Sequence, residues 1–349
     1  MRSVSRRLFL IGGATLLAGC GASGGKGGGQ AGSTSSPAGN NAAATPSGPP
    51  TKITAAYGAA EPAYLQFWIA KEAGIFLRHG LDVDLQVIPG AQVVPALISG
   101  QLQIGAAGPG ETIGADIGGA DLVMVATTSP SVPTFIYVPA SIKTAADLKG
   151  KKAAITNPGS TFDVLMRQAL PKMGLEPDKD VTLIATGSIT NAATALLNGA
   201  VSAAPVNVGA LSVKVEAAGF HSLYDTSNIQ FALQVLVLQR SYLASHRDVA
   251  QRFVDAFVEA VARERADKAF TIEVIKKYIQ VDDAPTLNAI YDAYSKDSVA
   301  PVYPFPKPEG FAIPLDEVIK RDEKAKGFDV TKSLDPSLVQ SAFDRKVGK

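Results

Sequence analysis

Between residues 51 and 210, short runs of apolar residues alternate with stretches in which apolar residues recur at helical spacing. Short apolar runs such as Ile53–Ala56 indicate buried strands, and stretches with apolar residues at helical spacing follow them. The first of these stretches, over 63–73, ends at Gly74, a residue type that commonly terminates helices. This alternation of strands and helices predicts an α/β fold built in layers.

The predicted order of elements, which is strand, loop, helix, strand, helix and strand, occurs twice. Strands are expected at 53–56, 83–88, 103–106, 152–155, 181–185 and 201–204, and helices at 63–73, 93–98, 162–170, 191–197, 249–263, 272–278 and 286–294. Glycines at equivalent turns are 94 to 99 residues apart, as in the pairs Gly80 and Gly174 or Gly100 and Gly199. This repeat predicts two similar lobes.

Two extended apolar segments, Pro133–Val138 and Phe231–Leu238, leave the first and the second predicted lobe. We expect them to form a two-stranded hinge about which the lobes close on a ligand. The expected organisation is a first lobe over 51–134, a second lobe over 135–232, and a return to the first lobe with C-terminal helices over 233–349.

The first 20 residues read as an export signal rather than as part of the fold. The pair Arg6-Arg7 precedes an apolar stretch that is too short to span a membrane and ends in Leu17-Ala18-Gly19-Cys20. Small residues before a cysteine form a lipobox, so we expect lipidation of Cys20 after export by the twin-arginine or the general secretory route. The alternative is a plain secretory peptide with a chance cysteine. Residues 21–50, rich in Gly, Ser, Pro and Ala, are expected to be a disordered tether.

Charge and composition exclude several classes of protein. The 33 basic residues are balanced by 32 acidic ones without a basic stripe, so nucleic acid is not an expected partner. The single cysteine excludes an intrachain disulfide and a cysteine metal cluster, and the three histidines are far apart in the sequence. We therefore expect a monomer without a cofactor or a bound metal.

Several short motifs, in a fixed order, resemble a known family. They include Gly74-Ile75-Phe76, Gly80-Leu81-Asp82-Val83, Ala96-Leu97-Ile98-Ser99-Gly100, Gln103-Ile104-Gly105 and Asp147-Leu148-Lys149-Gly150-Lys151. Together they resemble extracytoplasmic solute-binding proteins of the nitrate, sulfonate, taurine and thiamine-pyrimidine group, which serve ABC importers. The resemblance implies a two-lobed type II periplasmic-binding-protein fold without catalysis. The segment 199–207 departs from it, because the family usually has an acidic residue after this glycine.

Ligands of open parallel sheets bind beyond the carboxyl ends of the strands, which selects the loops at 57–62, 107–112, 157–162 and 205–209. In and beside these loops lie the candidate ligand-binding residues Tyr57, Glu61, Tyr64, Gly108, Glu111, Thr112, Asn157, Ser160, Thr161, Phe162 and Asn207. None of the four loops contains Lys or Arg, which weakens the case for a phosphate-like ligand.

Each candidate also has a structural interpretation. Ser160 and Thr161 are expected to donate to ligand oxygens, or to cap a helix locally. Glu61 and Glu111 would accept from an amine, an amidine-like edge or a hydroxyl, or would only favour the first turn of a helix. Tyr57 and Tyr64 could stack on a planar ligand, although Tyr64 could equally belong to the core. Asn207 would bond polar ligand atoms or shape a turn.

These expectations combine into a lipid-anchored receptor on the outer side of a bacterial cell membrane. We expect it to bind a small organic molecule, such as a sulfonate, a pyrimidine or an amine, and to deliver it to an ABC permease. A ligand-sensing partner of a membrane receptor fits the same sequence. A pyrimidine-synthesising enzyme of this fold fits less well, because such relatives use a cysteine-rich iron-binding motif and the only cysteine here is Cys20.

Overall fold

The computed structural model describes residues 48–131, 133–226, 229 and 231–349. The predicted export signal, with Cys20, and nearly all of the predicted tether lie outside these residues. Across the described ranges, no helix combines the length and the apolar character needed to cross a membrane.

Five strands form the first sheet, in the order β2-β1-β3-β10-β4. They are β1 (Thr51–Tyr57), β2 (Leu81–Val87), β3 (Ile104–Ala107), β4 (Leu122–Ser129) and β10 (Gln234–Gln239). β1 pairs in parallel with β2 and β3, whereas β10 is inserted antiparallel between β3 and β4. The first sheet is therefore complete only when the chain returns to it late in the sequence.

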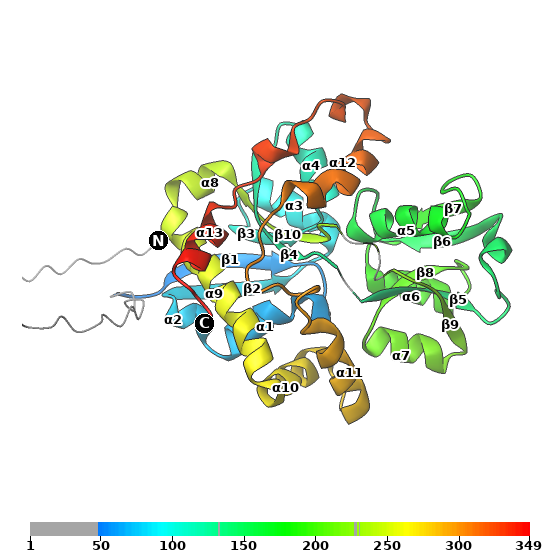
Figure 1. Cartoon of the computed structure of the whole chain (residues 1–349), viewed down its shortest axis with the longest axis horizontal. Coiled ribbons are helices and arrows are strands. Elements are labelled where there is room, and N and C mark those ends of the chain that lie inside the picture. The colour runs from blue at the N-terminus through cyan, green and yellow to red at the C-terminus, as the bar shows by residue number, and fades with distance from the viewer. Residues whose placement is uncertain (1–47, 132, 227–228, 230) are drawn as a thin grey trace, which may run out of the picture. The chain divides into compact units, whose positions relative to one another are not determined.

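Five further strands form what we call the second sheet (Figure 1). They are β5 (Thr134–Pro139), β6 (Lys151–Ile155), β7 (Val181–Ala185), β8 (Ala204–Asn207) and β9 (Phe220–Asp225). β5 lies antiparallel between β8 and β9, and β6 pairs in parallel with β7. The Ala154 N–H donates to the Ala203 carbonyl (2.8 Å), and the Ser202 N–H donates to the Lys152 carbonyl (2.7 Å). These bonds join β6 to the start of β8, which gives the order β7-β6-β8-β5-β9.

The two sheets share one topology, and this confirms the repeat predicted from the sequence. β1, β2 and β3 correspond to β6, β7 and β8, and the inserted strand β10 corresponds to β5. Each inserted strand is the first strand that the chain forms after leaving the other sheet. The second sheet is thus built from one continuous stretch of chain, whereas the first sheet receives β10 only after the chain returns.

Helices connect and cover the strands. Those of the first half are α1 (Leu65–Glu72), α2 (Ile75–Arg78), α3 (Gly90–Ile98), α4 (Pro109–Ile117), α5 (Thr161–Lys172), α6 (Ile189–Leu197) and α7 (Ala210–Ala217). Those that follow β10 are α8 (Arg240–Ser245), α9 (Arg247–Ala266), α10 (Lys268–Ile279), α11 (Ala284–Tyr294), α12 (Ala312–Ile319) and α13 (Ser337–Asp344). Short 3₁₀ helices are η1 (Pro62–Tyr64), η2 (Ala145–Leu148), η3 (Pro308–Phe311), η4 (Glu323–Ala325) and η5 (Val330–Ser333).

The apolar face predicted for the first helix packs against the long helix α9. Trp68 is fully buried, and the ring of Phe67 lies 5.4 Å from the ring of Phe257. The indole N–H of Trp68 donates to the Tyr57 hydroxyl at 2.8 Å, and its ring stacks on Tyr278 at 4.7 Å. This cluster fixes the start of α1, which is the segment that carries the first candidate residues toward the site.

Two element predictions need correction. The strand predicted at 201–204 lies at Ala204–Asn207, because its pairing with β5 sets its position rather than the apolar run. Helix α4 begins at Pro109, so Glu111 and Thr112 lie in its first turn and not in a loop. Most of the two predicted extended segments belongs to β5 and β10, which lie at the base of the crossings between the sheets. The boundaries of the two lobes stay predictions.

Candidate functional site

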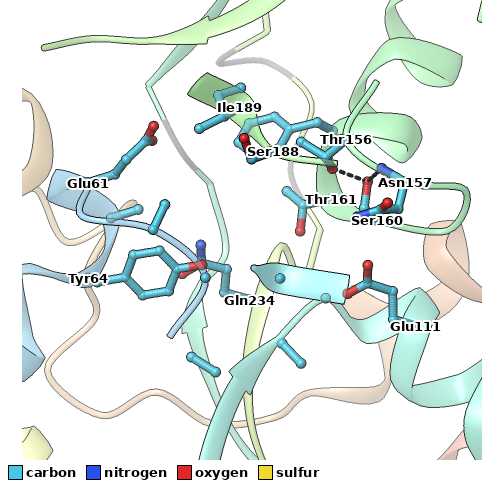
Figure 2. Close-up of a pocket in the computed structure, with 18 of the residues that line it drawn as sticks. Glu61, Tyr64, Glu111, Thr156, Asn157, Ser160, Thr161, Ser188, Ile189 and Gln234 are labelled. Carbon is cyan, nitrogen blue, oxygen red and sulfur yellow. Dashed lines mark hydrogen bonds between the residues drawn. The ribbon is translucent and has the colours of Figure 1, made fainter. Parts of the chain in front are cut away.

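A cavity is lined by residues that follow strands of both sheets (Figure 2). Its lining comprises Gly58, Ala59, Glu61, Ala63, Tyr64, Gly90, Ala106, Ala107, Gly108, Glu111, Thr156, Asn157, Ser160, Thr161, Phe162, Gly187, Ser188, Ile189, Asn207 and Gln234. The centre of a water molecule can reach about 70 Å³ of this space. One ordered water needs about 10–15 Å³ on this measure, so the cavity has room for more than a single water.

Glu61 is the most deeply buried carboxylate of the lining, with 7% of its surface exposed. Its Oε2 accepts a hydrogen bond from Asn207 Nδ2 at 2.5 Å, and Asn207 Oδ1 accepts one from the Thr134 hydroxyl at 2.6 Å. Burial raises the pKa of Glu61 to about 7, and the hydrogen bond from Asn207 opposes this rise only in part. Its Oε1 has no hydrogen-bond partner among the described residues. Glu61 therefore presents an unused acceptor atom.

Glu111 and Tyr64 add a second acidic group and a hydroxyl. Burial raises the pKa of Glu111 to about 7, against a hydrogen bond from the Gly108 backbone. Burial also raises the pKa of Tyr64, and the negative charges of Glu61 and Glu111 raise it further. The Tyr64 hydroxyl therefore keeps its proton and lies in the electric field of both carboxylates. A Cβ at Gly58 would lie 2.9 Å from that hydroxyl, so glycine is what lets the Tyr64 side chain occupy this place.

On the opposite wall, the hydroxyls of Ser160 and Thr161 are already engaged. Ser160 Oγ accepts from the Asp163 N–H at 3.3 Å and from the Thr156 hydroxyl at 2.6 Å, so it is the N-cap of α5. The Thr161 hydroxyl donates to the Leu233 carbonyl just before β10. Both residues line the cavity. Thr161 donates its hydroxyl proton locally, whereas Ser160 Oγ only accepts these bonds, so donation by the Ser160 hydroxyl to a ligand oxygen stays a prediction. Phe162 and Asn157 also line the cavity.

Two candidate residues lie away from the cavity, and we correct their assignment. Tyr57 is the last residue of β1, and its side chain is buried behind Tyr64, with ring centroids 5.0 Å apart. Thr112 is fully buried in α4, where its hydroxyl donates back to the Gly108 carbonyl at 3.0 Å. Tyr57 therefore supports Tyr64, and Thr112 stabilises the start of its helix.

Sequence reasoning missed Gln234, Thr156 and Ser188 as lining residues. Gln234 begins β10, and because β10 runs antiparallel to β3, its amino end lies beside the carboxyl end of β3. A polar residue inside the apolar run FALQVLVL was the available signal. Ser188 follows β7, whose loop obeys the same carboxyl-end rule as the loops that were selected.

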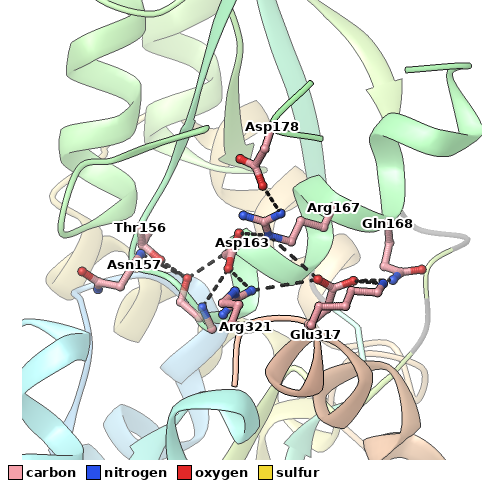
Figure 3. A network of polar contacts seen from close by, with 11 residues as sticks. Thr156, Asn157, Asp163, Arg167, Gln168, Asp178, Glu317 and Arg321 are labelled. Atoms are coloured by element: carbon pink, nitrogen blue, oxygen red, sulfur yellow. Dashed lines mark hydrogen bonds and ion pairs between the residues drawn. The ribbon is translucent and has the colours of Figure 1, made fainter. Parts of the chain in front are cut away.

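A buried network of charges lies beside the cavity and ties the second sheet's helix α5 to the C-terminal part of the chain (Figure 3). The carboxylate of Asp163, which is fully buried, accepts from the Gly159 N–H at 2.7 Å. It also forms ion pairs with Arg167 at 2.7 Å and with Arg321. Arg321 lies two residues after the end of α12, and α12 packs on α4, the helix after β3. The guanidinium of Arg321 is therefore paired with the Asp163 carboxylate.

Backbone atoms approach closely at the same border. A Cβ on Gly110 of α4 would lie 2.4 Å from the Gly159 carbonyl oxygen, so only glycine fits there. Gly159 has φ +85°, a left-handed conformation that glycine adopts without strain.

Comparison with known proteins identifies this architecture. Residues 61–267 match the model of the family described as NMT1/THI5 like. The chain belongs to the NMT1/THI5-like family. A candidate aliphatic sulfonate-binding protein of Escherichia coli (strain K12) is 28% identical over 217 residues, which cover 61% of this chain and 66% of that protein. The resemblance inferred from the short motifs is thereby confirmed at the level of the family.

Solved structures share the fold of this NMT1/THI5-like chain. The alkanesulfonate-binding protein SsuA of Xanthomonas axonopodis pv. citri, bound to MOPS, superposes with a TM-score of 0.66 at 21% identity and covers 85% of this chain and 99% of its own. The nitrate-binding protein NrtA of Synechocystis PCC 6803 superposes with a TM-score of 0.69 at 15% identity, covering 84% and 89%. The α/β periplasmic-binding-protein fold is thus confirmed.

The close approach at Gly110 predicts a sharp effect of one methyl group in this family member. Gly110→Ala should push Gly159 away, lower the free energy of unfolding by about 1–3 kcal/mol, and widen the cavity border. Gly114→Ala, in the same helix but with open space around its Cβ, is the matched control and should not destabilise the protein. Urea unfolding measures both. Equal stability of the two variants would contradict the packing described here.

The raised pKa of Glu61 predicts a pH dependence of stability. Because folding raises this pKa from 4.5 to about 7, the folded chain binds more protons than the unfolded chain between these values. The free energy of unfolding should therefore fall as pH rises across this interval and level off above about 7. Glu61→Gln should remove up to about 3 kcal/mol of this fall.

Glu323→Gln is the control, because the Glu323 side chain is 86% exposed. Part of the decrease in the free energy of unfolding should remain in Glu61→Gln, since burial also raises the pKa of Glu111 and Glu264 to about 7. Chemical denaturation at several pH values would measure this free energy for each variant. Superimposable profiles for wild type and Glu61→Gln would rule out a buried, cation-free Glu61.

Proposed function

We propose that this chain is an extracytoplasmic solute-binding protein that captures a small organic molecule and delivers it to an ABC importer. The observation that supports this most strongly is the cavity lined from both sheets, since such a site is assembled when the two halves come together. Relatives of the same family and fold are named as binding proteins for sulfonates and nitrate. The chain would act by binding alone, without catalysis.

Contacts that cross between the halves support a closing mechanism. Asn207 of β8 bonds Glu61 beside η1, and Thr161 of α5 bonds Leu233 just before β10. Arg321 pairs with Asp163 next to the same border. A ligand that bridges the two walls would add to these contacts and stabilise the closed arrangement.

The sequence before the described residues supports a membrane anchor. A lipid on Cys20 and the flexible composition of residues 21–50 would hold the binding unit near its permease on the outer side of the membrane. A sensor that partners a membrane receptor would use the same site and anchor. An importer is favoured, because the relatives are named for the solutes that they bind.

A ligand screen tests the binding function. At least one compound in a panel of small metabolites should raise the melting temperature and, by X-ray scattering, reduce the radius of gyration. Isothermal titration then gives its affinity. The Gly110→Ala variant should bind the same compound more weakly than Gly114→Ala does. Binding without compaction would argue against closure of the two halves.

The anchor has its own test. Cys20→Ala should release the protein from washed bacterial membranes while leaving ligand binding unchanged, because Cys20 belongs to the predicted export signal. Ser23→Ala, three residues after Cys20, is the control and should remain membrane-bound. Retention of Cys20→Ala by the membranes would exclude the lipobox assignment.

A further inference from the structure

The cavity offers carboxylates but no cation from the part of the chain that the structure describes. Glu61 and Glu111 both line it, whereas no described lining residue is Lys, Arg or His. Neither carboxylate belongs to an ion pair within the described ranges. The nearby guanidinium of Arg321 is paired with Asp163 instead. Glu61 therefore carries an unpaired negative charge whenever it ionises, whereas Glu111 also lines an adjoining cavity together with Arg321.

The unused oxygen of Glu61 shows where that charge is available. Oε1 is buried and unpartnered, while Oε2 is held by Asn207. Gln234, also 7% exposed, has an amide oxygen without a described partner on the same lining. An unpaired buried carboxylate is costly, and a positively charged donor is the group that offsets this cost best.

We propose, building on the function proposed above, that the ligand presents a protonated nitrogen group, such as an ammonium, amidinium or guanidinium, to Glu61 Oε1, with Glu111 adding to the negative field. A neutral donor could bond the oxygen but would leave the charge uncompensated. A simple anion, as the sulfonate and nitrate relatives bind, would meet two carboxylates and no cation among the described lining residues.

The polar groups on the opposite wall do not reverse this preference. The start of α5 is capped by Ser160 and the start of α6 by Ser188, whose Oγ accepts from the Asn191 N–H at 3.1 Å. The remaining amides at these helix starts could hold an oxygen of the same ligand. A zwitterion would therefore be accepted, with its cationic end toward Glu61.

Two series of isosteres separate charge from shape. Guanidinium, urea and nitrate are planar with four heavy atoms, and acetamidinium, acetamide and acetate form a second set. Isothermal titration at pH 7.5 should show that each cation binds about tenfold or more tightly than its neutral isostere, because charged hydrogen bonds are the stronger ones. The anions should bind most weakly. Tight binding of nitrate or acetate, without measurable binding of guanidinium or acetamidinium, would overturn the proposal.

A matched pair of variants locates the contact. Glu61→Gln keeps the shape and should weaken cation binding about tenfold or more while leaving urea and acetamide nearly unchanged. Glu323→Gln, at an exposed carboxylate, should leave every affinity as in the wild type. The melting temperature of Glu61→Gln verifies folding. Unchanged cation affinity in a folded Glu61→Gln protein would also overturn the proposal.

The pH dependence gives an independent readout. Around Glu61 lie Asn207 of β8, Tyr64 of η1 and Tyr294 of α11, whose pKa the charge of Glu61 raises. Glu111 of α4 acts on Tyr64 from the other side. None of these is a cation. Cation affinity should therefore rise between pH 5 and 8, and titration in buffers of different ionisation enthalpy should detect proton release near pH 6. Affinity that falls as pH rises would indicate an anionic ligand.

The outcomes also separate this proposal from the one on which it rests. If an anion binds and compacts the protein, the chain remains a solute receptor and only the charge of its ligand is wrong. If neither the isosteres nor the metabolite panel changes the melting temperature, the receptor function itself fails, and the ligand class fails with it.

Discussion

The antiparallel strand inserted into each sheet, β10 in the first and β5 in the second, is the constraint on which the rest of the structure depends. β4 pairs within the first sheet only with β10, and β9 pairs within the second sheet only with β5. The second sheet, β5 to β9, forms after one crossing, whereas the first sheet is complete only when the chain has crossed back and formed β10. The strands before and after each crossing are held in place by sheet hydrogen bonds.

The inserted strands also build the site. An inserted antiparallel strand brings its amino end to the edge where the parallel strands have their carboxyl ends. β10 thus places Gln234 beside the residues after β3, and β5 places Thr134 beside Asn207 at the end of β8. The wall that includes Gln234 therefore combines a late strand with the early strands β1 and β3.

This geometry explains which parts could be predicted. The strand β6 and the helix α1 could be predicted because a short apolar run and a regular apolar spacing are local patterns. The rule of carboxyl ends led to Glu61, Glu111 and Ser160, which all line the cavity. Gln234 was missed because the orientation of β10 is a long-range property. Tyr57 and Thr112 were wrongly assigned to the cavity. At a strand end and in a helix turn, some side chains face the core, and the side chains of these two residues are among them.

A shared fold does not fix the charge of the ligand, because the fold sets only where the strand ends and helix starts meet. The residues at those positions set the electrostatics, and here they include two carboxylates. Glu61 comes from the first half of the chain, yet its orientation is set by Asn207 and, through it, by Thr134 of the second sheet. Separation of the two sheets would break that hydrogen bond and expose the carboxylate to water. Closure of the two sheets buries the charge of ionised Glu61, which is unfavourable without a partner. A cationic group that binds this carboxylate would remove that cost and so stabilise the closed arrangement.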